Sequence, residues 1–416
     1  MEAHLADWIK DTPRGREAES ILRSCVHCGF CTATCPTYLL LGDELDGPRG
    51  RIYLIKQVLE GNEVTPVTQL HLDRCLTCRN CETTCPSGVR YGRLVDIGRE
   101  VVAERLPRKP VDALKRAALR QVLPRRRLFA LVLEVGRWLR PFLPSNVRSK
   151  LPPTRPAEAR PIGRHARKMV AMTVCVQDSL APNIDAAAAR VLDRLGIELV
   201  HAPAAGCCGA LRFHLDDHQG AKQQMRCNVQ QWSRDLDAGA ETIVSTASGC
   251  GAMVREYGHV LRGEPEHAAA ANRVSDATRD LSEIIAAEMN SVERLLKADW
   301  PADLPKSIAF HPPCTLQHGQ QIRGVVERIL TAVGFELTRV RDPHLCCGSA
   351  GTYSILHPDI AVRLRDDKLR NLQAGGAQAI ASANIGCLTH LASGTTTPVM
   401  HWIELLDRRM ATAPST

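Results

Sequence analysis

Residues 25–36 read CVHCGFCTATCP, and residues 75–86 read CLTCRNCETTCP. Both stretches follow the spacing C-x2-C-x2-C-x3-C-P, and each cysteine of the second lies 50 residues after its counterpart in the first. This spacing is typical of bacterial proteins that hold two [4Fe–4S] clusters, in which the fourth cysteine of each run binds the other cluster. We therefore expect two cubane clusters and the transfer of single electrons.

The interleaved arrangement predicts two ligand sets. The first comprises Cys25, Cys28, Cys31 and Cys85, and the second comprises Cys75, Cys78, Cys81 and Cys35. Two residues between thiolates allow the backbone to curl around a cubane, and the three-residue step carries the chain toward the neighbouring cluster. Zinc is the competing interpretation, because C-x2-C pairs also build zinc fingers. A zinc ion binds four ligands, usually as two separated pairs, so a repeated four-cysteine run favours clusters.

Length and composition indicate an intracellular chain with more than one domain. With 416 residues, the chain exceeds the size of about 250–300 residues at which a single hydrophobic core stops growing, so we expect two or three domains. The first 20 residues contain acidic side chains and no apolar run, which predicts no secretory signal. Cluster-type spacings among the 17 cysteines favour a reducing cytoplasm.

The positive charge is concentrated in residues 105–168, which hold 18 Lys and Arg against three acidic residues. A helical apolar stripe runs through Val111, Leu114, Ala118, Leu119 and Val122, and Phe129, Trp138 and Phe142 follow among arginines. An Arg-rich amphipathic helix with aromatic residues is typical of a segment at a membrane surface. Docking on a partner subunit or on the chain's own core is the favoured alternative. We expect no nucleic-acid binding, because no recognition fold accompanies these basic residues.

The second half of the chain contains another duplication. The first set of cysteines is Cys175, Cys207, Cys208 and Cys250, and the second set is Cys314, Cys346, Cys347 and Cys387. Counterparts are separated by 139, 139, 139 and 137 residues, and each set contains a Cys-Cys-Gly triplet. The remaining cysteine, Cys227, is expected on a helix face in a structural role.

Each copy is predicted to alternate strands and helices. In the first copy we expect strands at 173–179, 197–202 and 242–248, with helices at 184–195 and 221–237. In the second copy we expect strands at 307–311, 336–340 and 378–384, with helices at 325–333 and 360–373. Alternation of this kind predicts parallel sheets, whose sites gather at the carboxyl ends of the strands. Most of the cysteines follow predicted strands, so each set is expected to converge, and the two copies could face each other.

Several chemical roles are open to these eight thiols. A Cys-Cys-Gly turn presents two adjacent sulfurs, and its glycine permits close approach or a positive φ. A third iron–sulfur cluster, a zinc ion, or a group of reducible thiols would each fit such a set. The alternative is that some of the cysteines pack as small apolar side chains.

The fold class expected from these patterns is α+β. We predict a helical two-[4Fe–4S] ferredoxin-like domain followed by a duplicated α/β cysteine-rich domain. The expected boundaries are 1–104 for the ferredoxin-type domain, 105–168 for the basic amphipathic connector, 169–262 for the first Cys-Cys-Gly module, 263–305 for a helical spacer and 306–416 for the second module.

The chain resembles the family of glycolate oxidase iron–sulfur subunits over nearly its whole length. The resemblance rests on the two C-x2-C-x2-C-x3-C-P runs, on the sequence GPRGRI at residues 47–52, and on the two Cys-Cys-Gly modules. A wider group shares these motifs and includes iron–sulfur subunits of lactate utilisation, anaerobic glycerol-3-phosphate dehydrogenase and heterodisulfide reductase. The stretches CLTCRNCETTCPSGV and SANIGCLTH favour the glycolate branch.

One feature departs from the pattern of that group. In members with known chemistry each module ends in C-x-x-C, whereas here Met253 and His390 occupy the second cysteine position. This departure argues against a five-thiolate cluster of the heterodisulfide reductase kind. His390 is a candidate substitute ligand, and a surface or hydrogen-bonding role is the alternative.

The resemblance implies an electron-transfer subunit of an oxidoreductase. Glycolate would be oxidised to glyoxylate on separate flavin-bearing subunits, and this chain would pass the electrons to a quinone or a similar acceptor. No G-x-G-x-x-G fingerprint follows a predicted strand, and we identify no catalytic residues in the chain. The expected location is the cytoplasm, and the connector leaves peripheral contact with the inner face of the cell membrane open.

Three other functions remain as alternatives. The chain could serve a D-lactate or glycerol-3-phosphate dehydrogenase, or it could reduce a disulfide at its Cys-Cys-Gly sets. A cluster-bearing sensor or scaffold is the non-enzymatic alternative. Co-purification of a flavoprotein distinguishes the electron-transfer subunit from a scaffold, and disulfide reductase activity in the isolated chain would indicate the thiol-chemistry enzyme.

Overall fold

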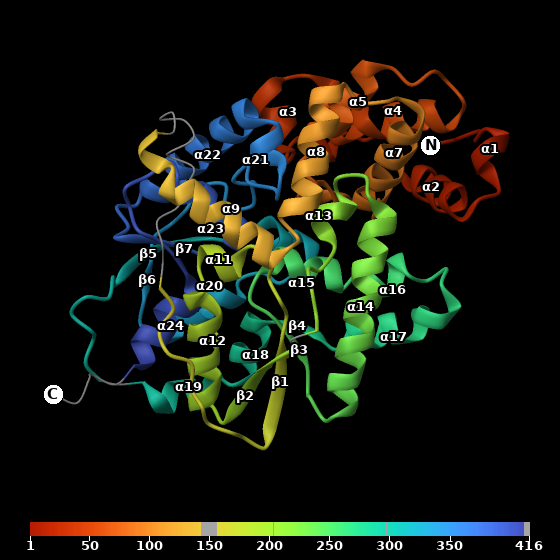
Figure 1. The fold of residues 1–416 in the computed structure, drawn as a ribbon. Coiled ribbons are helices and arrows are strands. Elements are labelled where there is room, and N and C mark those ends of the chain that lie inside the picture. The colour runs from red at the N-terminus through yellow and green to blue at the C-terminus, as the bar shows by residue number, and fades with distance from the viewer. Residues whose placement is uncertain (143–155, 203, 297, 412–416) are drawn as a thin grey trace.

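The computed structural model describes residues 1–142, 156–202, 204–296 and 298–411. A helical N-terminal domain sits above two small parallel sheets that are covered by helices (Figure 1). The α+β class and the order of a ferredoxin-type region followed by a duplicated α/β region are confirmed. None of the described helices combines the length and apolar content needed to cross a membrane.

The N-terminal domain is built from short helices. They are α1 (Asp7–Lys10), α2 (Pro13–Ser24), η1 (Phe30–Thr32), α3 (Pro36–Leu41), η2 (Glu44–Asp46), α4 (Pro48–Leu59), α5 (Pro66–Asp73), α6 (Asn80–Thr84) and α7 (Tyr91–Arg105). Four of them begin with proline, which suits the first helical position because its missing N–H has no intrahelical partner there. Ile55 of α4 and Leu94 of α7 are fully buried between these helices.

The second half contains two four-stranded sheets with the same topology. The strand orders are β2-β1-β3-β4 and β6-β5-β7-β8, and every pairing is parallel. The first sheet contains β1 (Arg167–Ala171), β2 (Ile197–His201), β3 (Ile243–Ser245) and β4 (Thr278–Asp280). The second contains β5 (Ser307–His311), β6 (Glu336–Leu337), β7 (Ala379–Ser382) and β8 (Val399–His401). The duplication seen in the cysteine spacing therefore extends to the whole module.

Helices connect the strands of each module. The first module has α11 (Gln177–Leu180), α12 (Asn183–Arg194), α13 (Ala210–Phe213), α14 (His218–Asp237), α15 (Ser248–Val254), α16 (Tyr257–Val260), α17 (Pro265–Asp276), α18 (Leu281–Ala287) and α19 (Met289–Leu295). The second has η4 (Thr315–Gly319), α20 (Val325–Ala332), α21 (Tyr353–Leu356), α22 (Pro358–Gln373), α23 (Ile385–Ala392) and α24 (Trp402–Met410).

The two modules pack against each other as pseudo-symmetric partners. Helix α12 contacts α24, and the equivalent pair, α20 and α18, makes the reciprocal contact. A single apolar core contains residues from both modules, including Ile184 of α12 and Leu405 of α24. At its edge, Asp407 accepts hydrogen bonds from Arg190 at 2.6 Å and from Arg194 at 2.9 Å. The modules therefore form one continuous unit, as the duplication suggested.

The structure corrects some of the expected elements. The strand predicted at 173–179 is wrong: the first strand is β1, residues 173–176 form a loop, and residues 177–179 belong to α11. The apolar residues of this stretch predicted a strand because burial continues past the last paired residue of β1 into the loop that carries Cys175. The segment 263–305, expected as a helical spacer, contains α17, α18 and α19 but also β4, the edge strand of the first sheet.

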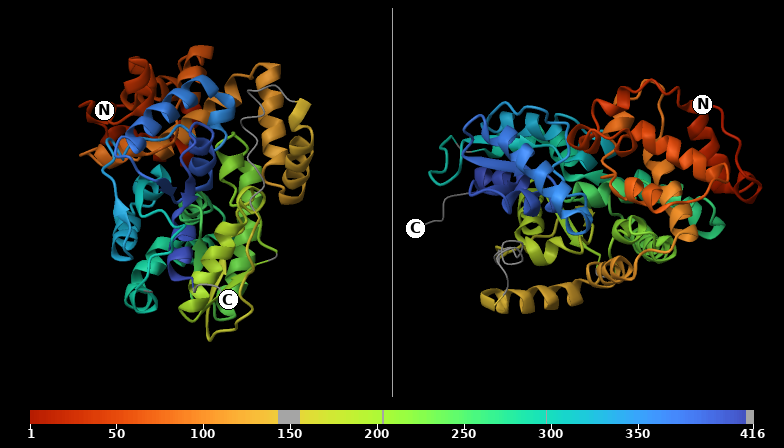
Figure 2. Two further views of the ribbon diagram at one scale, coloured as in Figure 1. Left: turned by 90° about the vertical axis from the view of Figure 1, so that its left-hand side faces the viewer. Right: turned by 90° about the horizontal axis from the view of Figure 1, so that it is seen from above.

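The connector begins with two helices on the outer surface, α8 (Pro110–Val122) and α9 (Arg126–Trp138), followed by η3 (Arg140–Phe142). Figure 2 shows α9 running along the edge of the molecule. The predicted stripe on α8 does not face the core, since Val111 and Leu114 are 66% and 72% exposed. The buried side chain of α8 is Arg116. Residues 143–155 of the predicted connector lie outside the described residues.

Acidic side chains from two other parts of the chain explain why an arginine is buried on α8. Arg108 donates to Asp73 of the N-terminal domain and, at 2.8 Å, to Asp216 of the first module. Arg116 donates to Asp73 at 3.1 Å. Burial opposes the charge of Asp73, but the two guanidinium groups nevertheless lower the pKa of this carboxyl. Helix α8 therefore ties the N-terminal domain to the first module.

Further ion pairs cross the boundary between the N-terminal domain and the first module. They are Arg79–Glu256, Arg93–Glu256, Glu17–Arg262 and Glu17–His259. Although burial acts in the opposite direction, His259 and Arg262 lower the pKa of Glu17 to about 2. The carboxylates of Glu17 and Glu256, whose pKa values are lowered, therefore stay ionised at this boundary near neutral pH.

Asp185, at the start of α12, supplies a pH-dependent element of stability. Its buried carboxyl accepts hydrogen bonds from Gln177 at 2.9 Å and from Thr246 at 2.6 Å, and burial raises its pKa from 3.8 to about 7. Because the folded-state pKa lies above the unfolded value, the carboxyl contributes less stability as pH rises through the interval between the two. We expect Asp185→Asn to remove this loss, which is about 2 kcal/mol between about pH 5 and about pH 8.

The measurement is the melting temperature of the cluster-loaded protein across that pH range. Between about pH 5 and about pH 8 the melting temperature of the wild type should fall by about 4–6 °C relative to that of Asp185→Asn, given the usual entropy of unfolding for a domain of this size. If the melting temperatures of the two proteins instead changed with pH by the same amount, Asp185 would be ionised in the folded state and the prediction would be wrong.

Candidate functional site

The first predicted ferredoxin set lies at the surface. Cys25, Cys28, Cys31 and Cys85 line a single hollow together with Phe30 and Arg49, and Cys81 of the second set reaches the same hollow. Cys28 is exposed, and the thiol of Cys31 interacts electrostatically with the other three members of its set. Burial raises the pKa of Cys31 to about 11. A thiol of this kind releases its proton when a metal binds.

The second predicted set lies deeper. Cys78 and Cys81 interact electrostatically with Cys75 and Cys35, and burial raises the pKa of Cys78 and of Cys81 well above the usual value. Cys35, which comes from the first run, belongs spatially to this group, just as Cys85 belongs to the first. The structure thus brings the eight cysteines together in the interleaved sets expected from the spacing.

The backbone repeats between the two runs as closely as the cysteines do. His27 and Thr77 both adopt left-handed conformations, with φ of 56° and 54°. Gly29 and Arg79, each located one residue after the second cysteine of its run, have φ of 85° and 60°. Two left-handed residues only two positions apart curl the chain tightly, and the amide of Thr77 points to the Cys75 sulfur at 3.4 Å. These loops fit a cubane in each set.

A buried cation lies beside the second set. Arg51 is 1% exposed and donates to the carbonyl of His71 at 2.7 Å, to Thr37 at 3.1 Å and to Asp46 at 3.3 Å. The Thr37 hydroxyl is 3.3 Å from the Cys35 sulfur. Positive charge and hydrogen bonds near cluster sulfurs tune reduction potential, so this network acts on the second cluster.

The Cys-Cys-Gly sets lie where the parallel sheets predict. In each module one cysteine follows the first strand, the pair follows the second strand, and the last cysteine follows the third, so all lie at the carboxyl edge. In the first module Cys175 contacts Cys207, and Cys208 contacts Cys250. In the second, Cys314 and Cys346 have sulfurs 3.9 Å apart. The four thiols of each module therefore converge.

The glycine of each triplet is required by its surroundings. Gly209 and Gly348 have φ of 85° and 86°, the left-handed region that side chains disfavour. A Cβ on Gly348 would lie 2.6 Å from the carbonyl oxygen of Ala361. The glycine thus lets the thiol pair approach α22.

The second module contacts the second ferredoxin set. Cys78 interacts electrostatically with Cys314 and Cys346, and these two cysteines share an apolar cluster with Leu76. Hydrogen bonds fix this boundary, since Asn80 donates to the carbonyl of His344 at 3.2 Å. The second cluster site therefore borders the thiols of the second module.

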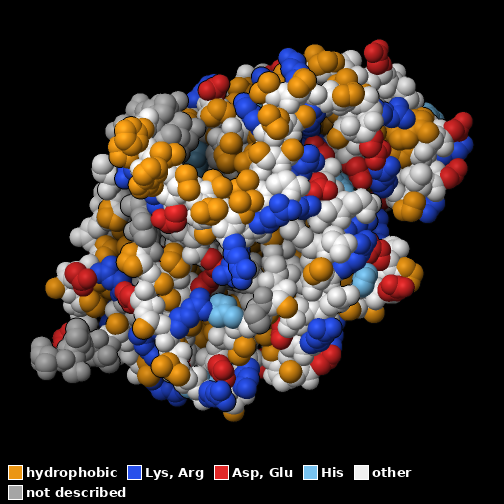
Figure 3. All heavy atoms as spheres, viewed as in Figure 1, with side chains coloured by type: hydrophobic (Ala, Val, Ile, Leu, Met, Phe, Trp, Pro, Cys, Tyr) orange, Lys and Arg blue, Asp and Glu red, His pale blue; other side chains and the backbone are white. Residues whose placement is uncertain are grey.

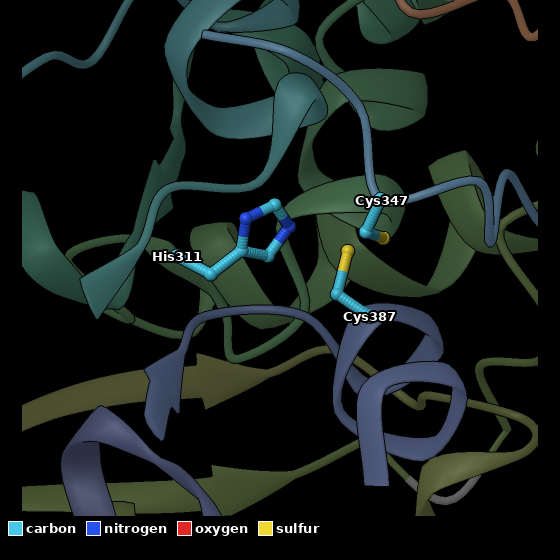
Figure 4. A group of neighbouring side chains, drawn as sticks. All are labelled: His311, Cys347 and Cys387. Atoms are coloured by element: carbon cyan, nitrogen blue, oxygen red, sulfur yellow. The ribbon is translucent and has the colours of Figure 1, made fainter. Parts of the chain in front are cut away.

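A histidine that was not predicted as a ligand from the sequence lies beside the cysteines of the second Cys-Cys-Gly module. The imidazole of His311, at the end of β5, and the sulfurs of Cys347 and Cys387 all lie within 4.8 Å of one another. Figure 4 shows the Cys387 sulfur directed toward the space between the imidazole and Cys347. The available signal was the sequence HPPC, which places His311 three residues before Cys314.

The two residues that replace the usual C-x-x-C cysteine are placed differently. His390 lies on α23, and its Nε2 is 3.1 Å from the carbonyl oxygen of Ala361. Met253 is buried in the apolar cluster that contains Cys208. Cys227, outside all sets, is exposed on α14.

Comparison with known families agrees with this division of the chain. Residues 21–89 match the 4Fe-4S dicluster domain, and residues 170–255 and 308–392 each match the cysteine-rich domain named CCG. The dicluster match supports two [4Fe–4S] clusters in the N-terminal domain.

Relatives and one solved structure extend the comparison. The chain is 54% identical over 412 residues to the glycolate oxidase iron–sulfur subunit of Escherichia coli K12, covering 99% of both chains. It is 28% identical to a probable glycolate oxidase iron–sulfur subunit of Bacillus subtilis 168, over 93% of this chain and 92% of that one. It is 29% identical to lactate utilization protein A of Geobacillus thermodenitrificans, over 58% of this chain and 99% of that protein.

A crystal structure of a hypothetical protein from Helicobacter pylori shares the fold, with a TM-score of 0.55 at 10% identity over 96% of this chain and 73% of that one. The extent and level of the sequence match to the Escherichia coli protein, together with the matching domains, decide the family. The chain belongs to the family of glycolate oxidase iron–sulfur subunits.

Proposed function

We propose that this chain is the electron-transfer subunit of a glycolate oxidase complex. It receives electrons from flavin-bearing partner subunits, which oxidise the 2-hydroxy acid, and passes them to a quinone or a similar acceptor. The observation that carries the proposal is the pair of cysteine sets with different exposure, one open to the surface and one bordering the second module. Two near-full-length relatives named as glycolate oxidase iron–sulfur subunits support the assignment.

The first cluster site is the proposed point of electron entry. Val26 and Phe30, which flank the cysteines of this set, are 66% and 61% exposed. Exposed apolar side chains beside a redox centre offer a surface on which a partner can exclude water. A flavin-bearing subunit docked there would come close to the most exposed ligand of the chain, Cys28.

The second cluster site is the proposed relay toward the acceptor. Its cysteines are more deeply buried than those of the first site, and Cys78 lies against Cys314 and Cys346 of the second module. An electron that reaches this cluster has therefore moved inward, away from the entry surface. The cationic Arg51 beside it stabilises the added negative charge.

Helix α9 and η3 are the proposed contact with a partner subunit. Leu131, Val135, Trp138 and Phe142 are 61%, 47%, 78% and 83% exposed. Figure 3 shows hydrophobic side chains gathered along this helix. Arg126 pairs with Asp178 at 2.6 Å, and Arg137 pairs with Glu134 on α9 itself. Because these two arginines are paired with acidic side chains of the chain itself, the apolar face suits a protein partner better than an anionic lipid surface.

Co-purification tests both parts of the proposal. The full chain is affinity-tagged, expressed with the flavin-bearing subunits of its complex, and the bound flavin is measured per chain. Wild type should retain flavin, and Trp138→Glu should weaken retention about 30-fold or more, since loss of a central interface tryptophan costs about 2 kcal/mol or more. Leu295→Glu is the matched control, because Leu295 is an exposed apolar residue on α19.

The outcomes separate the alternatives. Absence of any flavoprotein from the wild-type preparation would contradict the electron-transfer assignment. If Trp138→Glu kept its flavoprotein but no longer bound vesicles made with anionic lipid, α9 would be a membrane contact and not a subunit contact.

A further inference from the structure

We propose that His311, Cys347 and Cys387 bind one mononuclear metal ion of the zinc type, and that the first module has no equivalent site. The three side chains come from three different elements, the end of β5, the Cys-Cys-Gly turn and helix α23. They converge in the interior, and all three are buried.

The imidazole of His311 is buried without a hydrogen-bond partner among the described residues, which favours a bound metal ion. His311 is 1% exposed, and neither of its ring nitrogens has a hydrogen-bond partner among the described residues. An unsatisfied buried polar group destabilises the folded state, and a core histidine normally avoids this cost by bonding to a backbone or side-chain group. Its imidazole instead lies next to two thiols (Figure 4). Coordination of one nitrogen to a metal would remove this cost.

The spacing fits a single ion better than a cubane. The three donor atoms lie within 4.8 Å of one another. Two thiolates on one tetrahedral zinc ion, with Zn–S bonds of about 2.3 Å, lie about 3.8 Å apart. The thiolates of a cubane bind different irons, so their sulfurs must lie farther apart than two sulfurs on one ion.

The donor types and charges agree with zinc. Two thiolates and one imidazole are typical zinc ligands, and three protein donors leave one tetrahedral position for water or another side chain. Two thiolates neutralise a divalent ion, which lowers the cost of burying it. Lys368, which is 2% exposed, interacts electrostatically with Cys346 and Cys347 and offsets any further negative charge.

The first module differs at the decisive position. His311 lies opposite Ser382 of β7, and the residue in the equivalent position, opposite Ser245 of β3, is Met172. Met172 is 3% exposed and belongs to the apolar cluster that also contains Cys208. The duplicated modules have therefore diverged, and the proposed zinc site belongs to the second alone.

The site would have a defined place in the molecule. Zinc has no redox chemistry, so it would not carry electrons itself. It would fix β5, the Cys-Cys-Gly turn and α23 relative to one another, directly beside the Cys314–Cys346 pair that borders the second cluster. The proposal does not depend on which substrate the complex oxidises.

Metal analysis of the anaerobically purified full chain tests the site. Wild type should contain about one zinc per chain. Loss of a group that only hydrogen-bonds to a metal ligand already weakens metal affinity about 10–100-fold, so His311→Ala should keep less than about one fifth of the zinc after a chelator wash. Its iron content should be unchanged. Zinc K-edge X-ray absorption should show two sulfurs and an imidazole in wild type, and three sulfurs in His311→Cys, which should retain the ion.

Met172→Ala is the matched control, since it alters the equivalent position in the first module and should leave zinc unchanged. Retained iron in His311→Ala and retained zinc in His311→Cys show that the chain is folded. The proposal is overturned if wild type lacks zinc, if His311→Ala keeps it, or if His311→Ala loses iron in place of zinc.

Discussion

Cys31→Ser is expected to remove one of the two cubane clusters and to leave the other. The preparation should lose about four iron atoms per chain, the content of one cluster. Its reduced EPR spectrum should lose one signal and any splitting caused by interaction between the two clusters. Because electrons are proposed to enter at this set, reduction by the flavin-bearing partner should be almost abolished, whereas a small chemical reductant should still reduce the remaining cluster.

Two comparisons make this result specific. Cys85→Ser should reproduce the Cys31→Ser spectrum although Cys85 belongs to the second run, because the thiol of Cys31 interacts electrostatically with Cys25, Cys28 and Cys85. Cys227→Ser, which alters an exposed cysteine on α14, should change neither iron nor EPR. If Cys85→Ser instead removed the signal that Cys78→Ser removes, the interleaved ligand sets would be wrong.

Asp46→Ala is expected to cause a large loss of stability although it leaves every cysteine in place. Asp46 is fully buried and accepts hydrogen bonds from Arg51 at 3.3 Å, His71 at 2.9 Å and Arg74 at 2.9 Å. Removing the carboxylate leaves the buried Arg51 guanidinium without its counter-charge, which costs about 3–5 kcal/mol. The melting temperature should fall by about 10 °C.

We expect this variant to lose the second cluster before the first, because the hydrogen-bond network around Asp46 reaches the Cys35 sulfur through Thr37. Glu44→Ala is the control. It removes an ion pair with Arg49 from the same segment, but one whose partners are 42% and 37% exposed, so it should cost less than about 1 kcal/mol. Equal melting temperatures for the two variants would show that burial of the Asp46 network contributes nothing.

The cluster sites and the duplication could be predicted from the sequence because they are encoded locally. Fixed cysteine spacing within each run determines which thiols can share a cubane, and the 139-residue offset predicts two similar modules. The sequence GPRGRI at 47–52 is recognisable as a motif, but the need for these residues becomes clear only from their tertiary contacts. Gly50 lies so close to the Glu44 carbonyl that a Cβ would be 2.1 Å from it, and Arg51 serves the buried network.

Features that depend on distant segments escaped prediction. The apolar stripe of α8 suggested a core-facing or lipid-facing helix, whereas Arg116 is buried because Asp73 and Asp216 arrive from elsewhere in the chain. Strands β4 and β8 have three residues each, too few to show a period. The sequence pattern points to His390, which occupies the position of a missing cysteine, and not to His311. Only the folded sheet brings His311 to Cys347 and Cys387.

The acidic group formed by Asp43, Asp46 and His71 shows how similar clusters can differ in meaning. Its donor atoms lie within 4.8 Å of one another, as do those of the His311 group. Asp46, however, is already satisfied by Arg51, Arg74 and His71. The His311 imidazole has no such partner among the described residues, which is why only that group supports a metal site.

The most direct test of the account is EPR of the complete complex, frozen after anaerobic addition of glycolate. The flavin-bearing subunits hold the substrate site in this account, and the clusters of this chain are the next electron carriers. We predict that glycolate alone produces the reduced signals of both cubanes, and that in Cys31→Ser the remaining cluster stays oxidised while the flavin is reduced. Reduced flavin beside two fully oxidised clusters in the wild-type complex, with no acceptor present, would contradict electron transfer through this chain.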